Sequence, residues 1–341
     1  MFQKVNIEEA VGMVLGHDIT RILPREFKGP ALKKGHIIQE EDIPLLLSMG
    51  KRQVYVLNPG QGFVHEDEAA QRIAAAAAGP DLSLSPPSEG KVNLRANRQG
   101  LLKVNTYLLE QVNDLPDVML ATIHSNQVVS PGQDVAGTRI IPLIVQEQCL
   151  QRVEELCSQD ILIDIIPLRS AQVGLITTGS EVYTGLIQDG FGPVVRRKFE
   201  DLGSSIMTQV LVSDELDMTV QAIFDLLEQG ADLIALTGGM SVDPDDQTPA
   251  AIRASGAEIV TYGAPVLPGA MFMLAWLQGV PIVGLPGCVM YHQASIFDLV
   301  VPRLLAGEQV TRKDIVSLGH GGMCLSCPTC RYPRCALGKG I

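Results

Sequence analysis

Apolar and polar residues in the second half of the chain follow two alternating patterns. Short apolar runs bounded by glycine or aspartate are typical of buried strands, and apolar residues at every third or fourth position are typical of helices. The predicted strands are 173–178, 205–212 and 232–237, and the predicted helices are 193–202, 218–229 and 290–305. Because strands and helices alternate, we expect residues 171–305 to form an α/β domain with a largely parallel sheet covered by helices.

The first half of the chain differs, with many short alternating segments and frequent turns. We expect residues 1–79 to form a β-rich region that ends in an alanine-rich helix, and residues 88–165 to form a small α+β region. The proline- and serine-rich run at 85–88 marks a linker between them. Neither region carries a recognisable catalytic set of residues, so we interpret both as scaffold.

Charge and hydropathy exclude several classes of protein. The formal net charge of -12 opposes binding to nucleic acid. Residues 259–297 carry no charged side chain, but prolines and glycines divide them into pieces too short for a bilayer span of ~20 residues. The N-terminus has no apolar run that would act as a secretion signal. We therefore expect a cytoplasmic protein without a membrane span.

Three glycine-bearing loops, TTGSE (177–181), TGGMSVDPDD (237–246) and GLPGC (284–288), follow or end predicted strands. Ligands of parallel sheets bind at the carboxyl ends of the strands. Glycines there let backbone N–H groups approach a phosphate, and hydroxyl groups provide further hydrogen-bond donors. Carboxylates at the same edge are suitable ligands for Mg²⁺. Any one of these loops is more often a plain turn, and none matches GxGxxG. The predicted ligand-binding residues are Thr178, Gly179, Ser180, Thr237, Gly238, Gly239, Ser241, Pro286, Gly287 and Cys288.

Taken together, these loops and their order resemble a known domain. The runs VGLITTGSEV, DLIALTGGMSVDPDD, PVLPGAMF and GVPIVGLPGCVMYHQASIFDLVVPRLL are similar to the molybdopterin-binding domain of the molybdopterin molybdenumtransferase family, which includes the C-terminal domain of gephyrin. The resemblance covers residues 171–305 and implies a three-layer α/β fold that binds a pterin-phosphate cofactor. It further implies insertion of molybdate into adenylylated molybdopterin with Mg²⁺, a homo-oligomer, and a molybdenum enzyme as a further partner.

The resemblance also assigns three acidic residues. Glu181 matches the acidic residue of the family's TG-x-E loop, and Asp214 matches an acidic residue at the second strand end. Asp246 matches the aspartate that closes the TGGxSxGxxD loop. We therefore expect these three residues to be catalytic, through Mg²⁺ or molybdate.

Departures from the family pattern leave the reaction open. Asp243 stands where the family has glycine, and Cys288 stands where it has asparagine. The thiol of Cys288 either contacts the ligand or is an inert buried group, which we prefer. No aspartate-glycine-tyrosine-alanine motif precedes residue 171. The alternatives are a non-catalytic protein that carries, delivers or senses the cofactor and, more weakly, a hydrolase of nucleotide derivatives, as in another family with this domain.

The C-terminal segment 320–341 carries the run CLSCPTCRYPRC, with the spacing C-x2-C-x2-C-x4-C. Without a secretion signal, four such cysteines indicate a metal rather than disulfides. Four thiolates can hold a [4Fe–4S] cluster or zinc, and the first three match the local spacing of bacterial ferredoxins. The predicted ligands are Cys324, Cys327, Cys330 and Cys335. The alternative is a free or redox-active thiol segment.

Overall fold

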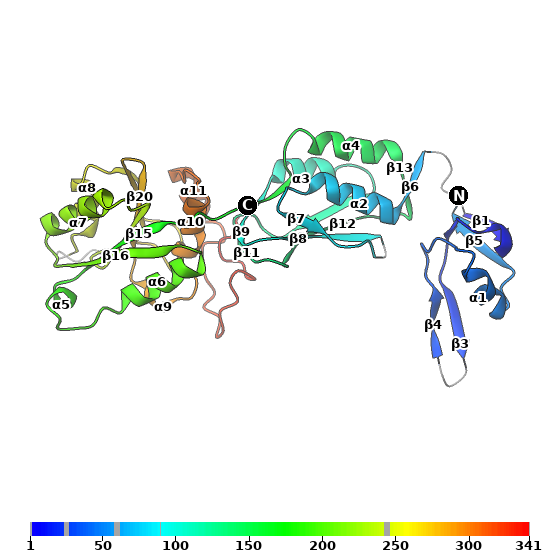
Figure 1. Cartoon of the computed structure of the whole chain (residues 1–341), viewed down its shortest axis with the longest axis horizontal. Helices are drawn as coiled ribbons and strands as arrows, with labels where there is room; N and C mark the ends of the chain where they lie inside the picture. Colours follow the sequence, from blue (N-terminus) through cyan, green and yellow to red (C-terminus); the bar gives the residue numbers. More distant parts are fainter. Residues whose placement is uncertain (1, 24–26, 58–61, 89, 242–245, 341) are drawn as a thin grey trace. The chain divides into compact units, whose positions relative to one another are not determined.

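The computed structural model describes residues 2–23, 27–57, 62–88, 90–241 and 246–340. The chain forms two compact units, one from residues 1–98, 102–123 and 129–165 and the other from 99–101, 124–128 and 166–341 (Figure 1). In the described ranges, no helix has the length and apolar character that crossing a membrane requires.

The first unit begins with a small β-rich body. Its elements are β1 (Phe2–Asn6), the 3-10 helix η1 (Ile7–Glu9), β2 (Val14–Leu15), β3 (Ile19–Leu23), β4 (Phe27–Leu32), α1 (Asp42–Ser48) and β5 (Gln53–Leu57). Strand β5 lies between β1 and β2 in an antiparallel sheet, and β3 and β4 form a hairpin. Buried side chains such as Leu15, Ile38 and Leu46 form a core of their own.

The remainder of the first half has mixed α and β structure. Its elements are β6 (Phe63–His65), α2 (Glu66–Ala77), β7 (Leu82–Leu84), β8 (Lys91–Ala96), β9 (Gly100–Val104), α3 (Thr106–Asn113), β10 (Val118–Thr122), β11 (Val128–Val129), β12 (Asp134–Ile140), β13 (Ile144–Gln146), α4 (Glu147–Cys157) and β14 (Ile163–Ile166). Helix α2 shares one core with β8, β12 and α4, and Arg72 of α2 binds Glu147 and Glu154 of α4, each at 2.8 Å. The helix that we assigned to the first region therefore packs with the elements that follow it.

The second unit contains the predicted α/β domain. Its elements are β15 (Gln172–Thr178), α5 (Ser180–Tyr183), α6 (Phe191–Asp201), β16 (Ser205–Val212), α7 (Leu216–Glu228), β17 (Leu233–Thr237), α8 (Thr248–Ala254), β18 (Glu258–Tyr262), β19 (Met273–Leu277), β20 (Val280–Leu285), α9 (Cys288–Tyr291), α10 (Ile296–Leu305) and α11 (Arg312–Ser317). They include a six-stranded sheet in the order β16-β15-β17-β20-β19-β18, in which the first four strands are parallel. Strands β18 and β19 run antiparallel to their neighbours.

Successive residues of the central strands point to opposite faces of the sheet, as the pleat requires. Ala235 of β17 packs into one core with Phe199 of α6 and Phe297 of α10. Its neighbour Ile234 packs into the other core with Ile223 of α7. Both faces are thus covered by helices, which confirms the predicted three-layer α/β fold with a largely parallel sheet (Figure 1).

The predicted helix at 290–305 is wrong, because the structure has two helices there, α9 and α10. Ser295 ends the break between them: its hydroxyl accepts from the N–H of Phe297, and the Asp298 carboxylate accepts from the N–H of Ser295 at 2.8 Å. This reciprocal capping box starts a new helix at Ile296.

Asp314 fastens α11 to the end of α10, and its loss is expected to weaken the α/β unit. Burial raises its pKa, but hydrogen bonds from Arg303 (2.8 Å) and Thr311 outweigh burial and lower that pKa from 3.8 to about 2. A lowered pKa means that Asp314 stabilises the fold above pH 3.8 and loses this effect as the pH falls towards 2.

We expect Asp314→Asn to lower the free energy of unfolding by about 1–2 kcal/mol at neutral pH and by much less near pH 2. The only tryptophan of the chain, Trp276, lies in β19. Its fluorescence during denaturation therefore reports on this unit. An equal effect at both pH values would contradict the assigned role of the charge.

Candidate functional site

The three predicted loops lie at one edge of the sheet. Strand β17 is hydrogen-bonded between β15 and β20, and all three strands are parallel. Their carboxyl ends therefore meet at the same edge, where the loops after Thr178, Thr237 and Leu285 begin. This edge is the candidate functional site.

Hydroxyl groups beneath the edge bond to one another and to the backbone. The buried Thr237 hydroxyl donates to Thr177 Oγ1 at 3.2 Å, which also accepts from Gln209 Nε2 at 3.1 Å. The buried Thr178 hydroxyl lies 3.3 Å from the carbonyl of Thr237 and 3.1 Å from Thr248 Oγ1. These hydroxyl groups therefore hold the loops together from inside the unit.

Gly238 and Gly239 form the tight turn after β17, with φ of +84° and +55°. A Cβ on Gly238 would collide with the carbonyl of Thr178, and one on Gly239 would lie 2.8 Å from Thr248 Oγ1. Thr248 Oγ1 also donates to the carbonyl of Gly238 at 2.8 Å. Among the hydrogen bonds of the described residues, the N–H groups of Gly238 and Gly239 have no acceptor. The turn thus presents two backbone donors at the sheet edge.

Asp214 binds the first loop directly. Its Oδ2 accepts from the N–H of Ser180 at 2.8 Å and from the Ser180 hydroxyl at 2.9 Å. The structure therefore brings Asp214 and Ser180 together, with Asp214 half-buried and Ser180 exposed. Gly179, at φ +142°, makes the turn before them, and Glu181 leaves its carboxylate exposed.

The acidic part of the second loop is only partly described. Asp246 is half-buried and Ser241 is exposed. Asp243 and Asp245, the other two aspartates of this loop, lie outside the described residues. Within the ranges that are described, no group of three or more His, Cys, Asp or Glu side chains is arranged to hold a single metal ion.

The third loop passes from β20 into α9. Pro286 is buried, Gly287 is exposed, and Cys288 is the first, half-buried residue of α9. Burial raises the pKa of the Cys288 thiol, so it is protonated at neutral pH.

The sequence did not indicate two residues outside the three loops that hydrogen-bond to the threonines beneath the edge. Gln209 lies in β16, and Thr248 begins α8 directly before Pro249. A Thr-Pro pair is a usual helix start, so the position of Thr248 had a sequence signal. Its contact with Gly238 and Thr178 had none, because that contact depends on how α8 returns to the sheet.

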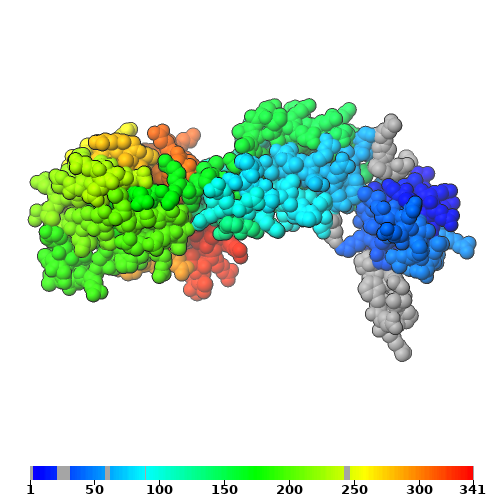
Figure 2. Space-filling model, in the orientation of Figure 1, coloured from blue at the N-terminus to red at the C-terminus, as the bar shows by residue number. Residues whose placement is uncertain are grey.

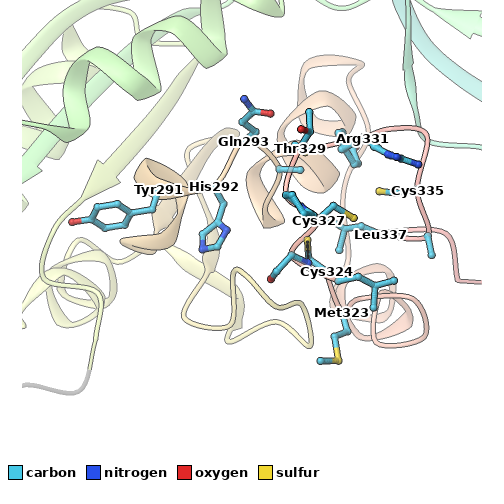
Figure 3. A pocket seen from close by; sticks show the side chains of 17 residues that line it. Tyr291, His292, Gln293, Met323, Cys324, Cys327, Thr329, Arg331, Cys335 and Leu337 are labelled. Carbon is cyan, nitrogen blue, oxygen red and sulfur yellow. Dashed lines mark hydrogen bonds between the residues drawn. The ribbon is translucent and has the colours of Figure 1, made fainter.

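The four cysteines of the C-terminal segment line one pocket of about 390 Å³, together with residues 291–294 (Figure 3). None of them is in a disulfide. Cys327 and Cys330 are exposed, and Cys324 and Cys335 are half-buried against the core of the α/β unit. Figure 2 shows the C-terminal residues, in red, on the surface of this unit. The four predicted metal ligands therefore line one pocket, but among the described residues no three of them are grouped as a metal site.

Comparison with known proteins gives a partial match. Residues 174–306 match a family described as a probable molybdopterin binding domain, and residues 4–58 match a domain of unknown function. The molybdopterin molybdenumtransferase of Staphylococcus aureus (strain COL) is 29% identical over 127 residues, which cover 35% of this chain and 30% of that protein. A CinA-like protein of Mycobacterium tuberculosis (strain ATCC 25177 / H37Ra) is 37% identical over 93 residues, which cover 27% and 21%.

Among solved structures, the tungsten cofactor synthesizing protein MoaB from Pyrococcus furiosus matches with 18% identity and a TM-score of 0.34. This match covers 41% of the chain and 98% of that protein. By contrast, the match covers only 30% of the molybdenumtransferase and 21% of the CinA-like protein, so the chain spans about a third or less of the length of these two relatives. The family match at 174–306 contains all three loops of the candidate site.

Proposed function

We propose that this chain, whose residues 174–306 belong to the molybdopterin-binding domain family, binds molybdopterin at the loops after β15, β17 and β20 and acts in molybdenum cofactor biosynthesis. The observation that carries the proposal is the turn at Gly238 and Gly239, whose two N–H groups lie at the sheet edge and have no acceptor among the described residues. Backbone amides in such a turn bind phosphate without a cationic side chain. This suits a protein with a net charge of -12.

Side chains of the neighbouring loops would complete the site. Ser241 is exposed and can add a hydroxyl donor, whereas the exposed Ser180 hydroxyl already donates to Asp214 and can accept. Gly179 and Gly287 allow close approach of the ligand. The loops would be supported from beneath by four buried or half-buried residues, Thr178, Thr237, Pro286 and Cys288.

The first experiment asks whether the pterin is bound. The full chain, purified from cells that make molybdopterin, is denatured and oxidised, and the extract is measured for pterin fluorescence. We expect about one pterin per chain at saturation, because the fold supplies one such set of strand ends. Absence of pterin in the extract, together with no binding in titration, would overturn the proposal.

The reaction that we propose is insertion of molybdate into adenylylated molybdopterin. Its support is the match of Glu181, Asp214 and Asp246 to the acidic positions of the family. Mg²⁺ would be held between carboxylates and ligand phosphate, as this ion prefers. The same proposal includes a molybdenum enzyme that receives the finished cofactor, and a chain that forms a homo-oligomer. The competing proposal is a carrier that binds the cofactor without turnover.

Asp246→Asn separates these two proposals. If Asp246 handles Mg²⁺ or molybdate, the variant should insert molybdate on the order of 100-fold more slowly while pterin binding persists, because the amide keeps the shape and loses the charge. The measurement is molybdate incorporation in the presence of Mg²⁺, beside pterin titration.

The matched control for the reaction is Asp243→Gly combined with Cys288→Asn, which restores the family residues. If neither the unmodified chain nor this double variant inserts molybdate, the carrier proposal replaces the enzyme proposal. Activity of the unmodified chain that survives Asp246→Asn would instead remove Asp246 from the catalytic set.

A further inference from the structure

The C-terminal segment is anchored to the α/β unit at both ends. At the first end, Met323 pairs with Leu267 as a parallel bridge, and the N–H of Cys324 donates to the Leu267 carbonyl at 2.7 Å. At the second end, Leu337 is 3% exposed within the core of the unit. Between them, the hydroxyl of Tyr332 donates to the carbonyl of Asp298 at 3.0 Å.

The loop between these anchors has no packing of its own to hold it. Residues 325–331 are all exposed, with Leu325 77% exposed, and contain no helix or strand. The hydrogen bonds of the described chain include one from a backbone N–H of this loop, that of Ser326 to Cys324 Sγ at 3.4 Å. Short segments without a core are commonly held by a metal centre. N–H donation to a cysteine sulfur is also a feature of iron–sulfur sites.

The cysteines are divided between the fixed and the exposed parts of the segment. Cys324 and Cys335 pack against the core beside the two anchors, and Cys327 and Cys330 lie on the exposed loop. All four line the pocket of about 390 Å³ (Figure 3). The other wall comes from residues 291–294, which are the last residue of α9 and the three that follow it.

The spacing of the cysteines distinguishes between the candidate metals. In the described part of the chain all four cysteines line one partly open pocket, and no three of them are grouped around a single ion. Structural zinc sites typically take their ligands as two separated pairs, as in C-x2–4-C followed by H-x3–5-H. The first three cysteines here have the C-x2-C-x2-C spacing that holds iron–sulfur clusters.

We propose that Cys324, Cys327, Cys330 and Cys335 bind one [4Fe–4S] cluster. This proposal is independent of pterin binding, because it uses other residues. The two sites are nonetheless neighbours: α9 begins at Cys288 of the third loop and ends at Tyr291 of the pocket wall. The three steps from Cys288 to Tyr291 rise by ~4.5 Å, so the wall of the cysteine pocket begins within one helical turn of the third loop.

The test uses the full chain, purified without oxygen and treated with equal amounts of ferrous and ferric iron and with sulfide. We expect about four iron and four sulfide per chain, with broad visible absorption that is bleached on reduction. Cys327→Ser and Cys330→Ser should each lose most of the iron and of the absorption. Both cysteines are exposed, so these variants should remain folded. The matched control is Cys149→Ser, a half-buried thiol of the other unit, which should keep the cluster.

Three results would overturn the cluster. These are about one zinc per chain without visible absorption, iron and zinc both absent, or equal loss of iron in Cys149→Ser and Cys327→Ser. Pterin fluorescence is measured on the same samples. Samples that contain pterin and no iron would contradict only the cluster proposal. Samples that contain iron and no pterin would contradict only the proposed function.

Discussion

Gly238→Ala is expected to weaken molybdopterin binding by on the order of 100-fold. Gly238 has φ of +84°, where an alanine side chain is strained, and its added Cβ would collide with the carbonyl of Thr178. Thr178 belongs to the central strand β15 and cannot withdraw, so the turn itself must move. Its two N–H groups would then no longer point at the phosphate. The measurement is the Kd for the pterin by titration.

Gly230→Ala is the matched control for this prediction. Gly230 follows α7 with φ of +87°, and a Cβ there would meet nothing within 4 Å. Both variants thus carry the same backbone strain, of about 1 kcal/mol, and only one carries the collision. Binding should be unchanged in Gly230→Ala. Equal weakening in both variants would show that strain in the unit, rather than the turn at Gly238, governs binding.

The strands of the α/β unit were predictable because each is a short apolar run with a polar or glycine boundary. The strand predicted at 205–212 coincides with β16, and that at 173–178 lies within β15. Strands buried on both faces read as continuous apolar runs, so these strands could be located from the sequence. Strand β18 and the order of the six strands in the sheet came from the structure alone. The position of the candidate site also follows from the sequence, since glycine loops after parallel strands meet at one edge.

Two features of the site required the structure. The hydroxyls of Thr178 and Thr237 were expected to face a ligand, but they bond inside the unit, and sequence does not say to which side a strand-end side chain turns. The apolar spacing through 290–305 predicted one helix, although the S-x-x-D pattern of Ser295 and Asp298 was a capping signal within it. The spacing of apolar residues predicts which face of a helix is buried, but it does not show that a capping residue has ended one helix and started another.

Asp298→Ala is expected to be the most destabilising substitution considered for the α/β unit, with a loss of about 3–5 kcal/mol. The Asp298 carboxylate binds the Lys198 ammonium at 2.8 Å, and the two side chains are 18% and 12% exposed. Removing one partner leaves the other charge poorly solvated, with the carbonyl of Gln293, at 2.8 Å, as its remaining acceptor. The same carboxylate caps α10 through the N–H of Ser295, which adds about 1 kcal/mol to the loss.

Denaturation followed by the fluorescence of Trp276 measures this loss in the unit that contains the pair. Lys198→Met in the Asp298→Ala background should recover part of it, because no charge is then stranded. The exposed pair of Arg152 and Glu155 in the other unit, with side chains 55% and 63% exposed, gives the contrast and is followed by circular dichroism, because Trp276 does not report on that unit. Glu155→Ala should change stability by about 0.5 kcal/mol or less. Two results would contradict this explanation. One is a loss in the free energy of unfolding for Asp298→Ala that is no larger than the loss for Glu155→Ala. The other is a double variant, Asp298→Ala with Lys198→Met, that is less stable than Asp298→Ala alone.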